Sequence, residues 1–447
     1  MEPQFDGKRA YEHVCQLALE IGPRLGGSEG EERAAEYIAE QFRSLGLEVR
    51  FQEFPVRSYG PSEKRLEVLE PPLGEVPAEA VWLAADTPPE GLEGEIRFLD
   101  SGAEEGIGPE VTGRIALATG GVRGPAYERL MRFRPLGLII IEPQVGTPPI
   151  RVEQLPEVRA KFGAVPTLRI SHEDGLRLLR EKARRVRVVV RTSERDGNSR
   201  NVIGELRGSF FPDEIVVVGG HYDTSLGIQG ASDNTGGTAL VLELARVFAQ
   251  AGSRRTLRFI AWGAEELGLR GSVCYTKELK RRDREARKSE GFVRGRDRTE
   301  LEQHRLCVNL DVHGAILGKN HAFVLGPADL SASVRLLARE TGIAHEVEEE
   351  VYSSDGTPLS EAGIPSVSFS RSGGTTSYLH SPRDVVDFLS AEALERSGRF
   401  VGLFLRRYVA EAAVFPFERK IPEEQQKKIR EYFEKRLQIE YLEEEAS

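Results

Sequence analysis

The sequence contains a set of acidic residues and histidines that stand where predicted strands end or a predicted helix begins. The set comprises His221, Asp223, Asp233, Glu265, Glu266, Asp311 and His380. Neutral imidazole and carboxylate groups are typical zinc ligands in enzymes. Because ligands bind at the carboxyl ends of the strands in an open α/β sheet, we expect these side chains to meet at one edge of one sheet. The pattern therefore predicts a metal site.

The ligand types and their number fit two zinc ions. If Asp233 bridges the two ions, His221 and Asp311 complete one site. Glu266 and His380 then complete the other, and each ion keeps a position for water. Cobalt or manganese can occupy similar ligands. Two metal ions about 3.5–4 Å apart acidify a shared water and polarise a carbonyl group, so the set predicts hydrolytic chemistry.

Two further acidic residues have predicted catalytic roles beside the ligands. Glu265 precedes the ligand Glu266 and is the candidate general base, which takes a proton from water and passes it to the leaving amine. Asp223 stands two residues after His221, on the same side of an extended segment. We expect its carboxylate to hold the second ring nitrogen of His221.

Apolar strands must bring these residues together. Continuous apolar runs occur at 215–220, 257–262, 307–312 and 365–370, and a helix is predicted over 236–250. Apolar strands that alternate with helices are typical of a parallel sheet buried on both faces. We therefore expect an α/β fold, with a mostly parallel, mixed sheet covered by helices on both faces.

The chain divides into four predicted blocks. Residues 1–60 and 191–412 are expected to form the two parts of the main domain, the second of which carries the metal ligands. Residues 61–190 contain short strands and their own apolar segments, which indicates a smaller, β-rich inserted domain. Residues 413–447 form a charged tail that is predicted to be helical.

Local patterns at the two ends of the chain predict helices. Ser28 and Glu31 form a possible capping box for a helix near residues 32–45. In the tail, an apolar stripe recurs every four residues, at Ile429, Phe433, Leu437 and Tyr441. This stripe indicates either a helix docked on the body of the protein or a contact between copies of the chain in a homo-oligomer.

The net charge and the cysteine content of the chain limit which partners and which cell compartment we expect. The chain has 447 residues and a formal net charge of -10, which argues against nucleic acid or an anionic membrane as a partner of the whole surface. No signal peptide is visible, and three widely spaced cysteines do not form a disulfide framework. We therefore expect a cytoplasmic protein.

The sequence resembles the co-catalytic zinc peptidase family of bacterial leucyl aminopeptidases and glutamate carboxypeptidase. The segments that carry the resemblance are Gly220–Ser225, Ala231–Gly237, Glu265–Ser272, Asn309–Asp311 and His380–Asp384, together with Gly22–Ser28 and Arg200–Ile203. The resemblance implies an aminopeptidase-type fold and the ligand assignment given above. Residues 61–190 are similar to a protease-associated insert through Gly113–Leu117 and Gly137–Ile141.

Three features depart from the family pattern. The family often has tyrosine directly before the last histidine, whereas this chain has Leu379 there and Tyr378 one residue earlier. An aspartate–histidine pair common in the family is replaced by Asp355 and Gly356. Residues 277–305 form a charged, mostly basic insertion, which is either a solvated helical excursion or a rim that faces acidic peptides.

The leading functional hypothesis is an aminopeptidase that releases N-terminal residues from peptides. A carboxypeptidase on the same scaffold would need a cationic pocket for the substrate carboxylate, for which Arg371 is the candidate, while Tyr378 is a candidate substrate contact. A glutaminyl cyclase-like transferase would use one zinc ion. A non-catalytic, receptor-like protein would be expected to lack ligands or the base, and none is missing here.

Overall fold

The computed structural model describes residues 4–437, which fold as two compact units. Within the described part of the chain, the first unit contains residues 4–56, 197–376 and 384–430, and the second contains 57–196, 377–383 and 431–437. The points at which the chain first leaves and re-enters the first unit lie in two long strands, β1 (Glu48–Glu70) and β8 (Arg185–Leu206).

A mixed sheet forms the centre of the first unit, with the strand order β13-β12-β14-β11-β9-β10-β8. Its further strands are β9 (Phe211–His221), β10 (Arg255–Trp262), β11 (His304–Leu310), β12 (Lys319–Leu325), β13 (His345–Glu348) and β14 (Ser366–Ser372). Strand β9 is parallel to β10 and β11, β11 is parallel to β14, and β12 is parallel to β13. Only β8–β10 and β12–β14 pair antiparallel among these described strands. The predicted mostly parallel, mixed sheet is confirmed.

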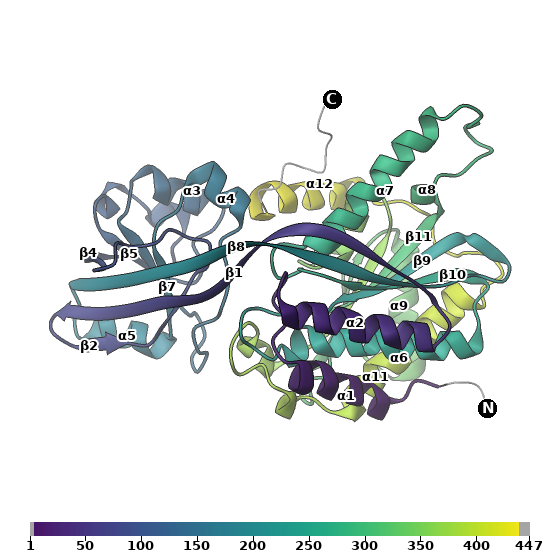
Figure 1. Ribbon diagram of the computed structural model, residues 1–447, viewed down its shortest axis with the longest axis horizontal. Helices are drawn as coiled ribbons and strands as arrows, with labels where there is room; N and C mark the ends of the chain where they lie inside the picture. Colours follow the sequence, from purple (N-terminus) through teal and green to yellow (C-terminus); the bar gives the residue numbers. More distant parts are fainter. Residues whose placement is uncertain (1–3, 438–447) are drawn as a thin grey trace. The chain divides into compact units, whose positions relative to one another are not determined.

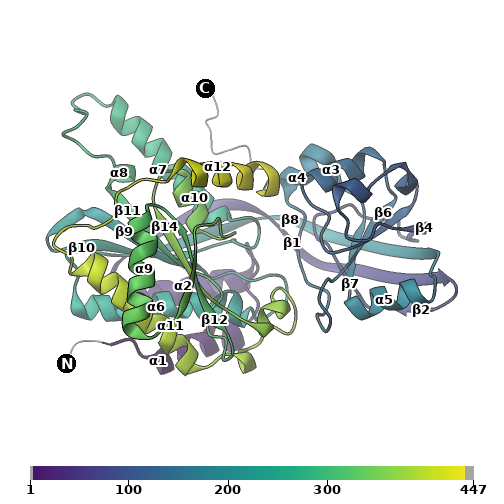
Figure 2. The same cartoon turned by 180° about the vertical axis from the view of Figure 1, so that it is seen from behind.

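Helices cover both faces of this sheet (Figures 1 and 2). One face is covered by α1 (Gly7–Cys15), α2 (Glu29–Ser44), α6 (Gly237–Ala251), α9 (Ala328–Thr341) and α11 (Ala391–Leu405). The opposite face is covered by α7 (Arg270–Lys288), α8 (Glu300–Gln303) and α10 (Gly356–Glu361). The prediction of helices on both faces is therefore confirmed.

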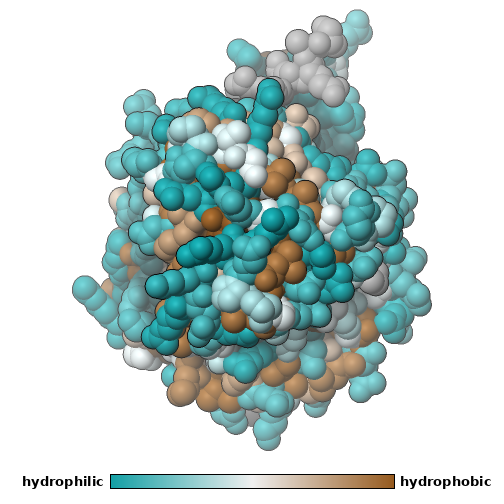
Figure 3. Space-filling model, turned by 90° about the vertical axis from the view of Figure 1, so that its left-hand side faces the viewer, coloured by the Kyte–Doolittle hydropathy of each residue, from teal (hydrophilic) through white to brown (hydrophobic). Residues whose placement is uncertain are grey.

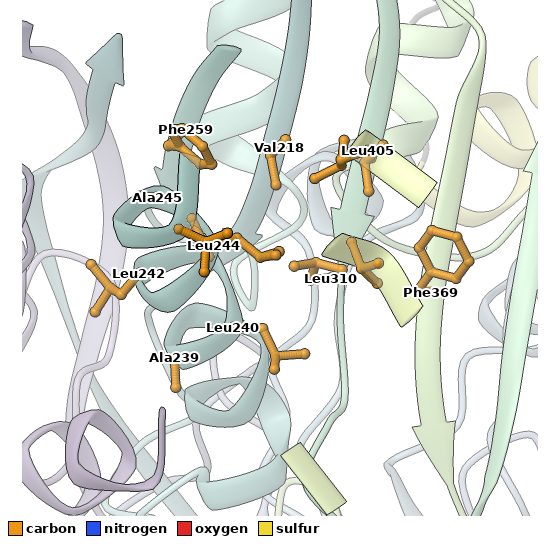
Figure 4. Close-up of a cluster of buried hydrophobic side chains, with 14 of the residues drawn as sticks. Val218, Ala239, Leu240, Leu242, Leu244, Ala245, Phe259, Leu310, Phe369 and Leu405 are labelled. Atoms are coloured by element: carbon orange, nitrogen blue, oxygen red, sulfur yellow. The ribbon is translucent and has the colours of Figure 1, made fainter. Parts of the chain in front are cut away.

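Alternation along the strands explains these two apolar layers. In β9, Val216 and Val218 belong to the larger core with α6, whereas Val217 belongs to the smaller core with α7 and α10. Successive strand residues point to opposite faces, so an apolar run without polar breaks is buried on both sides. Figure 4 shows the larger core, where Leu240 and Leu244 of α6 approach the strands. Complete burial of one such side chain stabilises the fold by about 1.5–3 kcal/mol.

The start of α2 differs from the predicted capping box. The hydroxyl oxygen of Ser28 accepts the backbone N–H of Glu31 at 3.2 Å, as expected. The reciprocal bond is absent, because the N–H of Ser28 donates to the carbonyl oxygen of Leu25 instead. The buried Glu31 carboxylate accepts hydrogen bonds from the N–H of Gly27, the hydroxyl of Ser199 and the N–H of Ala264. Ser28 therefore still caps the helix, but the Glu31 side chain bonds to distant residues in place of the N–H of Ser28.

The second unit has its own sheet and its own cores. Its strand order is β8-β4-β5-β6-β7-β3, and β2 pairs with β1. The elements are β2 (Gly74–Val76), β3 (Ala78–Ala80), β4 (Leu92–Phe98), β5 (Ile115–Thr119), β6 (Gly137–Ile141), β7 (Thr167–Ile170), α3 (Pro125–Arg132), α4 (Pro156–Phe162) and α5 (His172–Arg180). Alternate residues of β5 and β6 contribute to two separate apolar cores. The face shown in Figure 3 is mostly hydrophilic, with hydrophobic residues in small separate groups.

The charged segments near the C-terminus and at 277–305 are ordered by specific contacts. Helix α12 spans Glu423–Tyr432, and the stripe residues Ile429, Phe433 and Leu437 are buried, whereas Tyr441 lies outside the described residues. In the 277–305 segment, arginines pair with neighbouring carboxylates, as Arg287 does with Asp283 and Glu302. No described helix is long and apolar enough to span a membrane.

Candidate metal centre

His221 lies at the centre of the carboxylate cluster that the sequence predicts. It is the last residue of β9, and its ring is almost completely buried. Its Nε2 atom lies 3.1 Å from Oδ1 of Asp233 and 3.4 Å from Oδ1 of Asp311. Asp311 follows the neighbouring strand β11, which is parallel to β9 with Asn309 beside Gly219. The parallel register therefore brings the two strand ends, and their side chains, together.

Two groups of side chains in the described residues could each hold a metal ion. One comprises His221, Glu265 and Asp311, and the other comprises Asp233, Glu266 and His380. In each group, the ligand atoms all lie within 4.8 Å of one another. Asp233 belongs to the second group but lies 3.1 Å from His221 of the first. Its carboxylate thus lies beside a residue of each group. The second group consists of predicted ligands, whereas the first contains two predicted ligands and Glu265, the predicted base.

Asp223 connects the histidine to the segment that carries the two glutamates. Its Oδ1 accepts the backbone N–H of Glu265 at 2.9 Å, and its Oδ2 accepts the backbone N–H of Glu266 at 3.1 Å. Oδ1 also lies 3.3 Å from Nδ1 of His221. One buried carboxylate therefore lies beside the histidine ring and also fixes the backbone of the two glutamates, which the sequence does not reveal.

Asp384 holds the loop of the bridging carboxylate, and the sequence analysis assigns it no role. Its Oδ1 accepts the N–H and the hydroxyl of Ser232 at 2.9 and 2.8 Å, and its Oδ2 accepts the N–H of Asp233 at 3.1 Å. Burial, together with the nearby charge of Asp233, raises the pKa of Asp384 to about 6. The only sequence signal for this role is its place at the end of the His380–Asp384 motif.

Asn234 ties the same loop to the strand that carries Asp311. Its amide nitrogen donates to the carbonyl oxygen of Leu310 at 2.8 Å, and its amide oxygen accepts the N–H groups of Gly237 and Val312. The backbones approach so closely that a Cβ at Gly237 would lie 2.3 Å from the carbonyl oxygen of Leu310. Glycine is therefore required where α6 begins.

The electrostatics of the cluster favour a cation. Burial by itself lowers the pKa of His221, but Glu265 and the contacting aspartates outweigh it and raise that pKa well above its usual 6.5. Burial, with further contributions from Asp355 and Asp311, raises the pKa of Glu265 well above 4.5. Oδ1 of Asp311 is buried without a hydrogen-bond partner among the described residues. An excess of buried carboxylates and an acceptor without a donor fit a divalent metal, and the imidazole and carboxylate donors fit zinc.

Comparison with known proteins agrees with this geometry. The model of peptidase family M28 matches residues 201–405, which include the five predicted metal ligands. The aminopeptidase YwaD of Bacillus subtilis is 30% identical over 417 residues, covering 90% of this chain and 84% of that protein. The chain belongs to peptidase family M28. The resemblance inferred from its motifs is thereby confirmed.

Two further proteins similar to this M28 peptidase are named for different activities, one as an aminopeptidase and one as a carboxypeptidase. A solved structure of a zinc aminopeptidase from Bacillus subtilis superposes with a TM-score of 0.72 at 27% identity, covering 95% of this chain and all of that one. Carboxypeptidase Q of Bos taurus is 29% identical over 295 residues, covering 60% of each chain. The fold is therefore that of the zinc aminopeptidases.

Tyr352 is a residue of this M28 peptidase that the sequence analysis missed. Burial and the charges of Asp311 and Asp233 raise the pKa of its hydroxyl well above 10, so the hydroxyl stays protonated. It belongs to the segment between β13 and α10, whose sequence gives no sign that it returns to the metal ligands. A protonated hydroxyl beside the carboxylates is a hydrogen-bond donor for a reacting oxygen.

The two candidate substrate contacts, Arg371 and Tyr378, have different surroundings. Arg371 is buried, and its guanidinium donates to the carbonyl oxygens of Ala315 and Ile316 and to Oδ1 of Asn320. These bonds fix the position of the Arg371 guanidinium. Tyr378 lies under the guanidinium of Arg383, whose carbon is 5.3 Å from the centre of the tyrosine ring.

Proposed function

We propose that the chain is an aminopeptidase that uses two zinc ions to release N-terminal residues from peptides. The observation that carries the proposal is the position of His221, whose Nε2 lies 3.1 and 3.4 Å from the carboxylates of Asp233 and Asp311. Membership of a peptidase family and the likeness to zinc aminopeptidases support the same activity.

The described residues suit two ions with one bridging carboxylate. His221, Asp233 and Asp311 would hold one ion, and Asp233, Glu266 and His380 would hold the other. Zinc bound there would supply Lewis-acid chemistry, by acidifying water and polarising the scissile carbonyl. Cobalt or manganese remains an alternative occupant, because the same donor atoms accept them.

Glu265 is the proposed general base. Its backbone is fixed by Asp223, and its Oε2 lies 3.9 Å from Nε2 of His221. At that position the carboxylate can take a proton from the attacking water and return it to the leaving amine. Burial and the neighbouring carboxylates raise the affinity of Glu265 for a proton, which suits a group that must hold one during the reaction.

Tyr352 is proposed to stabilise the substrate oxygen as it gains negative charge. The tyrosine that the family pattern leads us to expect before His380 is replaced by Leu379. The pKa of the Tyr352 hydroxyl is raised by burial and by the charges of Asp311 and Asp233, so this hydroxyl offers a protonated donor near the same cluster.

A carboxypeptidase on the same scaffold is the alternative, because carboxypeptidase Q is among the relatives. That activity requires a cation for the substrate carboxylate. Arg371, the candidate for this role, lines a cavity that contains none of the metal ligands, which disfavours the alternative. A cyclase with one zinc ion and a receptor without catalysis are disfavoured by the complete ligand set.

The terminus specificity can be tested directly with the purified, zinc-loaded protein. Aminoacyl-4-nitroanilides and free peptides should be cleaved from the amino end, whereas peptides with a blocked amino terminus should resist cleavage. Release of C-terminal residues from blocked peptides would instead establish the carboxypeptidase. Elemental analysis should give two zinc ions per chain, and an inactive protein with both metals bound would favour a binding role.

The region 61–190 is proposed to be a protease-associated insert. The separate cores of the second unit support an independently packed domain. A cytoplasmic location and a homo-oligomer through the tail stay predictions, as do the absence of nucleic-acid and membrane partners. Size measurement in solution and cell fractionation would test the first two.

A further inference from the structure

A cavity in the first unit contains no residue of the metal-ligand groups. It has a volume of about 440 Å³ and is lined where β12 and β13 begin, where β14 ends, and by one side chain of α11. This volume lies in the range of small-molecule sites, about 300–1,000 Å³. The cavity is therefore large enough for a small ligand separate from the peptide substrate.

Cations dominate the lining. Lys319, Arg371 and Arg396 face the cavity, whereas Glu346 is the only carboxylate in the lining. Glu346 is already paired with Lys319 at 2.8 Å. His345 adds no charge at neutral pH, because burial against the ring of Phe400, at a centroid distance of 3.8 Å, lowers its pKa to about 4. Two positive charges remain in excess, in a chain with a formal net charge of -10.

The two arginines lack carboxylate partners. The guanidinium of Arg371 makes all its described hydrogen bonds with neutral acceptors, and Arg396 has no ion pair within the described part of the chain. Burial and the charge of Arg396 lower the pKa of Arg371, which means that the two cations act on each other without a carboxylate between them. Arg396 is exposed to solvent, so its charge is open to an anion that enters the cavity.

We propose that this cavity binds a small oxyanion with two negative charges, of the phosphate or dicarboxylate class. Arg371 donates to the carbonyl oxygens of Ala315 and Ile316 and to Oδ1 of Asn320, so three of its five N–H groups are used and two remain. Arg396 projects from α11 as an exposed side chain and closes on the bound anion. Lys319, at the start of β12, is already paired with Glu346 and adds no net charge.

The test is calorimetric titration of the zinc-loaded full chain with inorganic phosphate, sulfate and succinate at constant ionic strength. The matched variants are R396Q and R399Q. Arg399 lies on the same helix and pairs with Glu395 at 3.8 Å, and it does not line the cavity. Both arginines are exposed, so neither variant should change the thermal midpoint in chloride.

The wild type and R399Q should bind one equivalent of anion, and R396Q should bind it at least about tenfold more weakly, as expected for the loss of one charge-assisted interaction. Phosphate and sulfate binding without succinate would assign tetrahedral anions, and succinate binding would assign carboxylates. Equal affinity of R396Q and wild type would place the anion elsewhere, at the metal ions for instance, and would overturn the proposal. Absence of binding to the wild type would overturn it as well.

Discussion

Asp384 accepts the backbone N–H of Asp233 at 3.1 Å, so the carboxylate that bridges the two candidate metal sites is held in place by a second carboxylate 151 residues further along the chain. The same side chain accepts two hydrogen bonds from Ser232. These hydrogen bonds fix the backbone of the Ser232–Asp233 segment without requiring a bound ion. A ligand loop that is preorganised in this way costs less to order on metal binding.

Replacement of Asp384 by asparagine should weaken the metal centre. In D384N, an amide N–H₂ group would face one of the N–H donors of the Ser232–Asp233 segment, and one hydrogen bond would be lost. We expect metal affinity or activity to fall about 10–100-fold, the usual effect of losing a partner of a metal ligand. Zinc titration and kcat measurement check this. The exposed D387N is the control, and a D384N protein with wild-type zinc affinity and kcat would contradict the assignment.

The two adjacent glutamates should respond differently to the same substitution. E265Q removes the proposed base, so kcat should fall by about 10²–10⁴ while both zinc ions stay bound. E266Q removes a ligand oxygen and should lose metal as well as activity. Elemental analysis beside steady-state kinetics separates the two cases. Full metal content and wild-type turnover in both variants would show that the roles are wrongly assigned.

Tyr352 and Tyr378 offer a direct comparison of the donor found in the structure with the candidate from the sequence. Y352F should lower kcat by about 10²–10³ and leave KM and zinc content almost unchanged, because the hydroxyl acts mainly on the developing charge. Y378F should have a much smaller effect. A larger fall of kcat in Y378F than in Y352F would instead assign the role to Tyr378.

Stability should decrease in acid through a buried hydrogen-bond chain. Nη1 of Arg258 donates to the hydroxyl of Tyr275, that hydroxyl donates to Nε2 of His304, and Nδ1 of His304 donates to the carbonyl oxygen of Glu300. A proton on Nε2 would face the hydroxyl hydrogen of Tyr275 and would add a second buried positive charge near Arg258. Burial, reinforced by the charge of Arg258, therefore lowers the pKa of His304 to about 3.

The sign of the pH effect follows from this lowered pKa. Below about pH 6.5 the unfolded chain binds a proton at this histidine that the folded chain refuses, so the contribution of His304 is complete above pH 6.5 and is lost as the pH falls towards 3. The loss amounts to about 4–5 kcal/mol at most. Urea unfolding of wild type and H304Q in EDTA between pH 7 and 4 measures it. The wild type should show the steeper slope, and identical slopes would refute the assignment.

The sequence by itself determined the type of sheet and the edge at which the chemistry occurs. Apolar runs without polar breaks could be buried only between two layers of helices, and parallel strands place their carboxyl ends together. The ends of β9, β10 and β11 therefore had to meet, and with them His221, Glu266 and Asp311. These inferences needed only strand periodicity and the chemical type of the next residue.

Only the tertiary structure decided which polar partners each of the other residues meets. Glu31 has the spacing of a capping residue, but its carboxylate binds Ser199 and the N–H of Ala264. Arg371 has the chemistry of a substrate clamp, but it donates to backbone carbonyl oxygens and lines a cavity without metal ligands, and the charges of Asp311 and Asp233 act on the pKa of Tyr352 from a loop without a motif. Such partners are separated by tens to hundreds of residues, and local spacing carries no information about contacts that form only when distant segments pack.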